Sequence, residues 1–128
     1  MSTSGRSPAE TLLAVQLEQA GIPFEREYKF HESRRWRADF AIVLFRHPSE
    51  PSYAAPDRVD ILVEVEGGAY VQGRHTRGPA FEADCEKYSA AAILGYRVIR
   101  VTPRQVEDGR ALSWIKAALG LEDSRDAA

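Results

Sequence analysis

The spacing of apolar residues along the chain predicts helices and strands in a definite order. Residues 7–21 place leucine and valine mainly on one side of a helix, with Ser7 suited to its N-cap and Gly21 to its end. Alternating, branched and aromatic residues predict strands at 23–30, 36–45, 59–67 and 96–102. The remaining predicted helices are 80–94 and 111–120, and 103–108 starts the element that leads into the last one.

The resulting order, α-β-β-β-α-β-α, predicts an α/β fold. The first two strands are close enough in sequence to form a hairpin. The third and fourth strands are joined by a helix, which implies a parallel pair with a right-handed crossover. We therefore expect a small mixed sheet of about four strands, flanked by helices on both faces. Residues 46–58 and 67–79 are predicted loops, because they are rich in proline or glycine and show no period.

The length of 128 residues favours a single domain, with a core at about 7–119 and flexible tails at 1–6 and 121–128. Cys85 is the only cysteine, so it forms no internal disulfide, which favours a reducing compartment. The sequence has no apolar stretch near the roughly 20 residues that cross a bilayer. We therefore expect a cytoplasmic protein that does not bind membranes.

The predicted helix at 80–94 has two neighbouring stripes with different chemistry. Steps of four, three and four residues predict a core-packing stripe formed by Phe81, Cys85, Tyr88 and Ala92. The adjoining stripe, which can border a functional site, is formed by Asp84, Lys87 and Ala91.

Two acids interrupt the apolar strand at 59–67. Glu64 and Glu66 are two residues apart and therefore point to the same face of the sheet, about 6–7 Å from each other. Burying such a pair requires arginines, raised pKa values or a metal ion. Asp39, in the neighbouring predicted strand, is a third acid in an apolar segment. Carboxylates are ligands of Mg²⁺ and Mn²⁺, and the carbonyl of Val65 can join them.

The segment "RADF" at 37–40, followed by "VEVEG" at 63–67 and later by "LGYRVIRVT" at 94–102, resembles the PD-(D/E)XK nuclease superfamily. Within it, the chain looks most like the branch of very-short-patch repair endonucleases and their small, often phage-borne relatives. The resemblance covers roughly residues 7–102. It implies a restriction-endonuclease-like fold and metal-dependent hydrolysis of DNA.

The resemblance assigns roles to single residues. Asp39 matches the metal-binding aspartate of the superfamily, and Glu64 matches the first acid of its (D/E)XK element. Glu66 stands where the superfamily has lysine; glutamate can bind metal or accept a proton but supplies no positive charge. Some relatives carry that cation on the following helix, where Lys87 is the candidate. Lys87 is equally explained by a helical ion pair with Asp84.

Two further residues have alternative interpretations. His75 lies in the glycine-rich loop "GRHTRG", where the resembling branch has a histidine that takes part in catalysis; otherwise it is a surface residue. Glu10 matches the acid that superfamily members often place beside the metal from the first helix. The segment "SPAE" is also a capping box, with Ser7 at the N-cap, and this explains Glu10 without a function.

The basic residues favour a nucleic-acid partner in spite of a net charge of −2, because 14 of the 17 are arginine. Arginine matches phosphate geometry better than lysine does. The candidate DNA-binding residues are Arg34, Arg35, Arg37, Arg74 and Arg77. The leading prediction is an endodeoxyribonuclease with Mg²⁺ or Mn²⁺, which can act as a homodimer. Two alternatives stay open: a catalytically silent nucleic-acid-binding module, and a carboxylate-based hydrolase of another substrate.

Overall fold

The chain forms the predicted alternation of strands and helices. The structure, a computed structural model, describes residues 7–45, 57–67 and 78–121. Its elements are α1 (Pro8–Gln19), β1 (Phe24–Lys29), β2 (Arg37–Phe45), β3 (Asp57–Val65), α3 (Pro79–Ile93), β4 (Arg97–Val101), α4 (Pro103–Glu107) and α5 (Arg110–Ala118). The predicted tails, apart from Leu121, and most of the two predicted loops lie outside the described residues.

The four strands form one mixed sheet in the order β1-β2-β3-β4. β1 pairs antiparallel with β2, β2 pairs antiparallel with β3, and β3 pairs parallel with β4. The predicted hairpin and the predicted parallel pair joined by a helix are both present. The prediction of a small mixed α/β fold with four strands is therefore confirmed.

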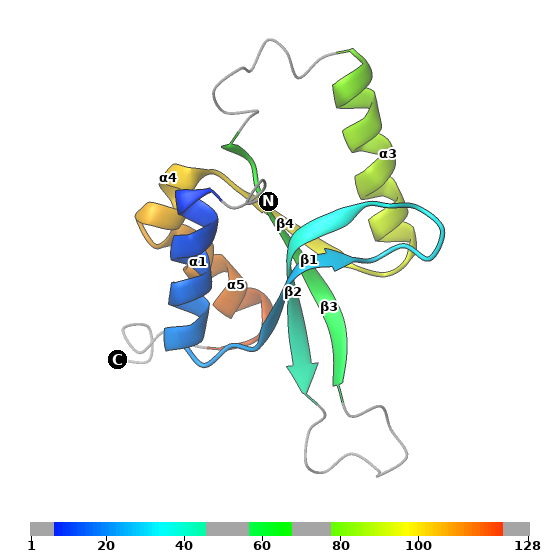
Figure 1. The fold of residues 1–128 in the computed structure, drawn as a ribbon. Helices are drawn as coiled ribbons and strands as arrows, with labels where there is room; N and C mark the ends of the chain where they lie inside the picture. Colours follow the sequence, from blue (N-terminus) through cyan, green and yellow to red (C-terminus); the bar gives the residue numbers. More distant parts are fainter. Residues whose placement is uncertain (1–6, 46–56, 68–77, 122–128) are drawn as a thin grey trace.

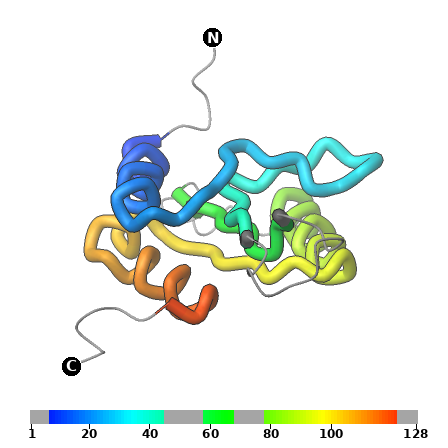
Figure 2. Tube along the Cα trace, turned by 90° about the horizontal axis from the view of Figure 1, so that it is seen from below, coloured from blue at the N-terminus to red at the C-terminus, as the bar shows by residue number. Residues whose placement is uncertain are grey.

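Helices cover both faces of the sheet (Figure 1). α1, α4 and α5 lie on one side and α3 lies on the other, as the view from below in Figure 2 also shows. The side chains of β3 point alternately to the two faces of the sheet. Ile61 and Val63 belong to the core under α1, α4 and α5, and Leu62 belongs to the core under α3. This alternation follows directly from the period of two in a strand.

The core-facing stripe of α3 differs from the predicted one. Phe81 is 52% exposed, and Cys85 and Ala92 are also exposed. The residue of α3 that is fully buried is Ala91, which packs with Ala41 and Leu62 of the sheet. A helix that meets the sheet through alanines can approach it closely, so Lys87 and Ala91 of the neighbouring stripe face inward, and the prediction for Phe81, Cys85 and Ala92 was wrong.

The C-terminal segment contains two short helices instead of one. α4 starts at Pro103 behind a capping box formed by Thr102 and Gln105. Gly109 then adopts a φ of 89°, a left-handed conformation that suits glycine and separates α4 from α5. Among the described residues, no helix is long and apolar enough to cross a membrane.

Candidate functional site

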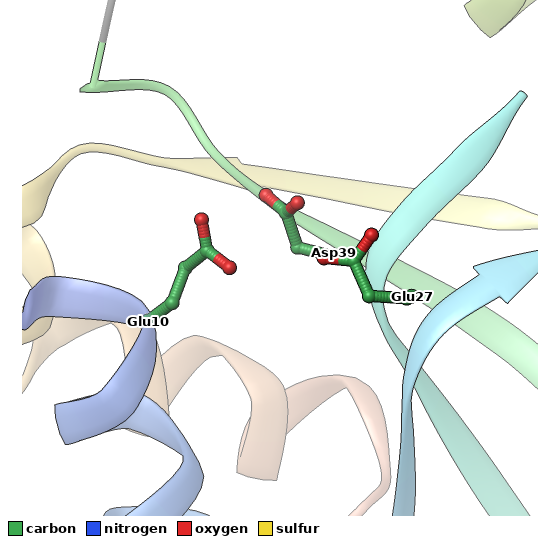
Figure 3. Close-up of side chains that lie close together, drawn as sticks. All are labelled: Glu10, Glu27 and Asp39. Atoms are coloured by element: carbon green, nitrogen blue, oxygen red, sulfur yellow. The ribbon is translucent and has the colours of Figure 1, made fainter. Parts of the chain in front are cut away.

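Three carboxylates from three elements meet in one place. Glu10 comes from α1, Glu27 from β1 and Asp39 from β2 (Figure 3). One oxygen of each lies within 4.8 Å of an oxygen of the other two. The cluster therefore joins the first helix to the hairpin.

Asp39 is fixed by the backbone of the neighbouring strand. Its Oδ2 accepts a hydrogen bond of 2.8 Å from the N–H of Val65. The β2–β3 pairing reaches Phe40 and Val63, so the Asp39 side chain takes a backbone donor just beyond the last pair. The neighbours Ala38 and Phe40 are buried and anchor this part of β2. The result is a carboxylate held in a defined position beside β3.

Glu27 joins the cluster through an irregular backbone. Its φ is 52°, in the left-handed region that non-glycine residues seldom adopt. The register pairs Arg26 with Phe40 and Tyr28 with Ala38 and passes over Glu27. The Oε2 of Glu27 is buried and, among the described residues, has no hydrogen-bond partner. The alternation in 23–30 predicted an ordinary strand and gave Glu27 no role in the site, so it was missed; no local signal distinguishes it.

The capping explanation of Glu10 accounts for its backbone and not for its side chain. The N–H of Glu10 donates to the side chain of Ser7 at 3.2 Å, as an N-cap requires. Its carboxylate lies 3.5 Å from Arg26 and near Asp39. Glu10 is only 5% exposed, which is unusual for a surface cap. The carboxylate is therefore available to the acidic cluster.

Glu64 lies outside this group of three and is paired with Lys87. The Nζ of Lys87, on α3, is 3.1 Å from Oε2 of Glu64 on β3. Glu64 is 8% exposed, so this is a largely buried ion pair. Within the described residues, the ion pair of Lys87 is with Glu64 and not with Asp84. The helical-pair explanation of Lys87 is therefore wrong.

Burial and mutual repulsion raise the pKa values of these acids. Burial, followed by the charge of Asp39, raises the pKa of Glu10 to about 6. Burial raises the pKa of Glu64 to about 7, with Lys87 lowering it and Asp39 raising it further. Burial also raises the pKa of Asp39, although its hydrogen bond from Val65 opposes this. Asp39 is thus the acid whose charge acts on both Glu10 and Glu64.

Glu66 has different partners from those of Glu64. Its Oε2 accepts hydrogen bonds from Nε of Arg100 at 2.8 Å and from the hydroxyl of Tyr88 at 3.3 Å. The guanidinium of Arg100 lies 4.4 Å from the centre of the Tyr88 ring. Neither Tyr88 nor Arg100 was a predicted site residue, because their spacing in sequence carries no sign that they meet.

The predicted DNA-binding arginines are placed only in part. Arg34 is exposed, and its guanidinium lies 2.8 Å from the carboxylate of Glu86. The same group stacks over Trp36, 3.8 Å from the ring centre. Arg35 and Arg37 are also exposed, around the start of β2. The other predicted DNA-binding arginines, Arg74 and Arg77, lie outside the described residues, as does the predicted catalytic residue His75.

The arrangement combines oxygen ligands with two nearby cations, Arg26 at Glu10 and Lys87 at Glu64. Carboxylate oxygens that converge from Glu10, Glu27 and Asp39 suit a hard divalent ion. Lys87 places a positive charge beside Glu64, next to the same region. A scan against protein-family models, a search of the curated proteins and a search of the solved structures each found no match to this chain.

Proposed function

We propose that the protein is an endodeoxyribonuclease that hydrolyses DNA phosphodiester bonds with Mg²⁺ or Mn²⁺. The observation that carries this proposal is the convergence of three acids around Asp39, with a lysine held at the adjoining acid Glu64. The resemblance of 37–40 and 63–67 to the PD-(D/E)XK pattern independently favours the same chemistry.

The acidic cluster suits a divalent ion. A buried carboxylate oxygen without a partner is costly, and Oε2 of Glu27 is such an atom among the described residues. Glu10 and Asp39 each repel the other, as the raised pKa of Glu10 reflects. We assign Glu10, Glu27 and Asp39 to holding the ion, with the carbonyl of Val65 as a further predicted ligand. A bound ion of this kind polarises a phosphoryl oxygen and lowers the pKa of a water ligand.

Glu64 and Lys87 supply the proton acceptor and the positive charge. With a pKa raised to about 7, Glu64 can accept a proton from an attacking water near neutral pH. Lys87 can release Glu64 and contact a phosphate oxygen, because an ammonium group is a compact and mobile charge. This assignment provides the cation that Glu66 cannot provide. His75 remains a predicted participant, outside the described residues.

The hairpin arginines provide the predicted contact with the DNA backbone. Arg35 and Arg37 are exposed and therefore free to meet phosphates, and Arg34 is exposed although it pairs with Glu86. Such contacts release counterions, so DNA binding is expected to weaken steeply as salt is added.

Cleavage of supercoiled plasmid tests the proposal directly. The wild-type protein is incubated with Mg²⁺, with Mn²⁺ and with EDTA, and nicked or linear product is measured. Asp39→Asn keeps an oxygen that can accept the Val65 hydrogen bond, and it is expected to lower cleavage more than about a hundredfold, as the loss of a main electrostatic contact does. Asp60→Asn is the matched control, because Asp60 lies on β3 and pairs with Arg97 away from the cluster.

Each outcome has a defined meaning. Metal-dependent cleavage that Asp39→Asn abolishes and Asp60→Asn leaves unchanged supports the nuclease. DNA binding without cleavage in any metal would favour the silent binding module, which the glutamate at position 66 favours. Absence of both binding and cleavage, with linear and branched DNA as substrates, would overturn the proposal.

A further inference from the structure

The first half of α3, which precedes Lys87, is not held by the apolar core. All six residues from Phe81 to Glu86 are exposed, and the fully buried residue of the helix, Ala91, lies in its C-terminal half. Figure 1 shows the N-terminal half of α3 extending beyond the strands. Apolar packing therefore fixes the C-terminal half of the helix, and Lys87 lies at the edge of that packing, one turn before Ala91.

Polar contacts around Glu66 meet this helix one residue after Lys87. The hydroxyl of Tyr88 donates to Oε2 of Glu66 at 3.3 Å, and the same oxygen accepts from Nε of Arg100 at 2.8 Å. The Arg100 guanidinium also stacks on the Tyr88 ring, 4.4 Å from its centre. One carboxylate oxygen of Glu66, the residue after the end of β3, thus binds a residue of α3 and a residue of β4.

Two adjacent residues of α3 thus meet the two acids on either side of Val65, at the end of β3. Glu64 lies on β3, and Glu66 directly follows the last residue of that strand, Val65. Lys87 reaches Glu64 at 3.1 Å, while Tyr88 reaches Glu66 at 3.3 Å. If the hydrogen bond between Tyr88 and Glu66 were lost, α3 could rotate or move away from β3, and Lys87 would no longer be held at Glu64.

We propose that Glu66, Tyr88 and Arg100 form a positioning cluster that holds the Lys87 ammonium at Glu64. These are positioning residues and not catalytic ones, since they act through Lys87. The catalytic consequence rests on the proposed function; the structural consequence does not. Glu66, which stands where the resembling superfamily has lysine, then has a role of its own: it orients the helix that carries Lys87.

Chemical labelling of lysine tests the cluster without metal or DNA. The chain has three lysines, so trace acetylation followed by mass spectrometry can compare Lys87 with the internal references Lys29 and Lys116. Tyr88→Phe removes the hydroxyl and keeps the ring under Arg100. It is expected to raise the labelling rate of Lys87 about fivefold or more, as the loss of a hydrogen bond to a charged group would. Glu66→Gln is expected to raise the labelling rate of Lys87 less, because the amide oxygen can still accept the hydrogen bond from Tyr88.

Tyr96→Phe is the matched control. Tyr96 follows the C-terminal end of α3, and its hydroxyl is hydrogen-bonded to Tyr28 and not to Glu66. Unchanged labelling of Lys87 in both Tyr88→Phe and Glu66→Gln would overturn the proposal, as would an equal increase in Tyr96→Phe, which would indicate general loosening. Thermal unfolding of each variant confirms that it is folded.

Kinetics separate this proposal from the proposed function. In assays of DNA cleavage, Tyr88→Phe is expected to lower kcat about tenfold and to leave KM unchanged. The reason is that Lys87 acts in the chemical step, whereas Tyr88 does not contact the substrate. If the wild-type protein cuts no DNA, the nuclease proposal fails and the labelling result still decides the cluster. If it cuts DNA and neither Lys87 labelling nor kcat changes in Tyr88→Phe, the cluster fails and the nuclease stands.

Discussion

Lys87 on α3 lies 3.1 Å from Glu64 on β3, so the following helix neutralises an acid of the third strand. The two residues are 23 positions apart, and the crossover between the parallel strands brings them together. This ion pair between Lys87 and Glu64 lies in the same region as Asp39.

The stability of the metal-free protein is expected to fall as pH rises. Glu10 and Glu64 have ordinary pKa values of 4.5, raised in the folded state to about 6 and about 7. Between these values the folded state binds more protons than the unfolded state, so the free energy of unfolding decreases with increasing pH. At about 1.4 kcal/mol per pH unit, the two raised pKa values correspond to a loss of up to about 5 kcal/mol between about pH 4.5 and pH 8. Urea unfolding across this range measures it.

Glu64→Gln provides the control for this dependence, because it removes the group with the larger shift. The variant should show a much smaller decrease over the same pH range. A wild-type protein that becomes more stable from pH 5 to pH 8 would contradict the raised pKa values of the two acids.

Lys87→Met is expected to destabilise the protein more at high pH than at low pH. Above the raised pKa of Glu64, about 7, the variant leaves a largely buried carboxylate without its partner. We expect a loss of about 2 kcal/mol at pH 8, where Glu64 must stay charged or take up a proton at a cost. At about pH 5 Glu64 is protonated, so the loss should be smaller.

Lys87→Arg is the matched variant, since it keeps the positive charge. Denaturant unfolding at both pH values compares the two variants with the wild type. An equal loss for Lys87→Met at pH 5 and pH 8 would mean that Lys87 stabilises through its aliphatic chain and not through the ion pair with Glu64.

Divalent ions are expected to stabilise the folded protein, and Glu27 is expected to contribute to this effect. Binding of Mn²⁺ at a concentration a hundredfold above Kd should add about 2.7 kcal/mol. Glu27→Gln removes one carboxylate of the cluster and should weaken binding about tenfold, which corresponds to about 1.4 kcal/mol. The Tm measured against Mn²⁺ and Mg²⁺ concentration gives both values.

Glu25→Gln is the control for Glu27→Gln, because Glu25 is exposed on the same strand. Its metal affinity should equal that of the wild type. If both variants bind Mn²⁺ as the wild type does, Glu27 is not a ligand and the site would need to be reassigned to Glu10 and Asp39 with other groups.

Arg35 and Arg37 are expected to contact DNA phosphates. Replacing either by alanine should reduce the slope of log affinity against log salt by about 1, since each phosphate contact releases about one counterion. Arg110→Ala serves for comparison, because Arg110 is paired with Asp108 at the start of α5. Fluorescence anisotropy of labelled DNA with Ca²⁺ in place of Mg²⁺ measures binding. Equal slopes for all variants would remove the hairpin from the DNA interface.

The sequence alone determined the features that depend on local order. Alternation in 59–67 placed Glu64 and Glu66 on one face, and the helix between two apolar strands implied their parallel pairing. Both follow from periods of 2.0 and 3.6 residues and from the handedness of the chain. The acid in 36–45 was recognisable as a site residue because an unpaired carboxylate is costly in an apolar strand.

Tertiary structure decided which side chains meet. Glu27 enters the cluster because its φ of 52° interrupts the alternation of β1, which no neighbouring residue signals. Lys87 faces Glu64, and Phe81 remains exposed, because the sheet under α3 accepts Ala91 in place of the larger side chains. Such choices depend on the shapes and charges of surfaces that are distant in sequence, so the period of a helix defines its candidate faces but only packing selects between them.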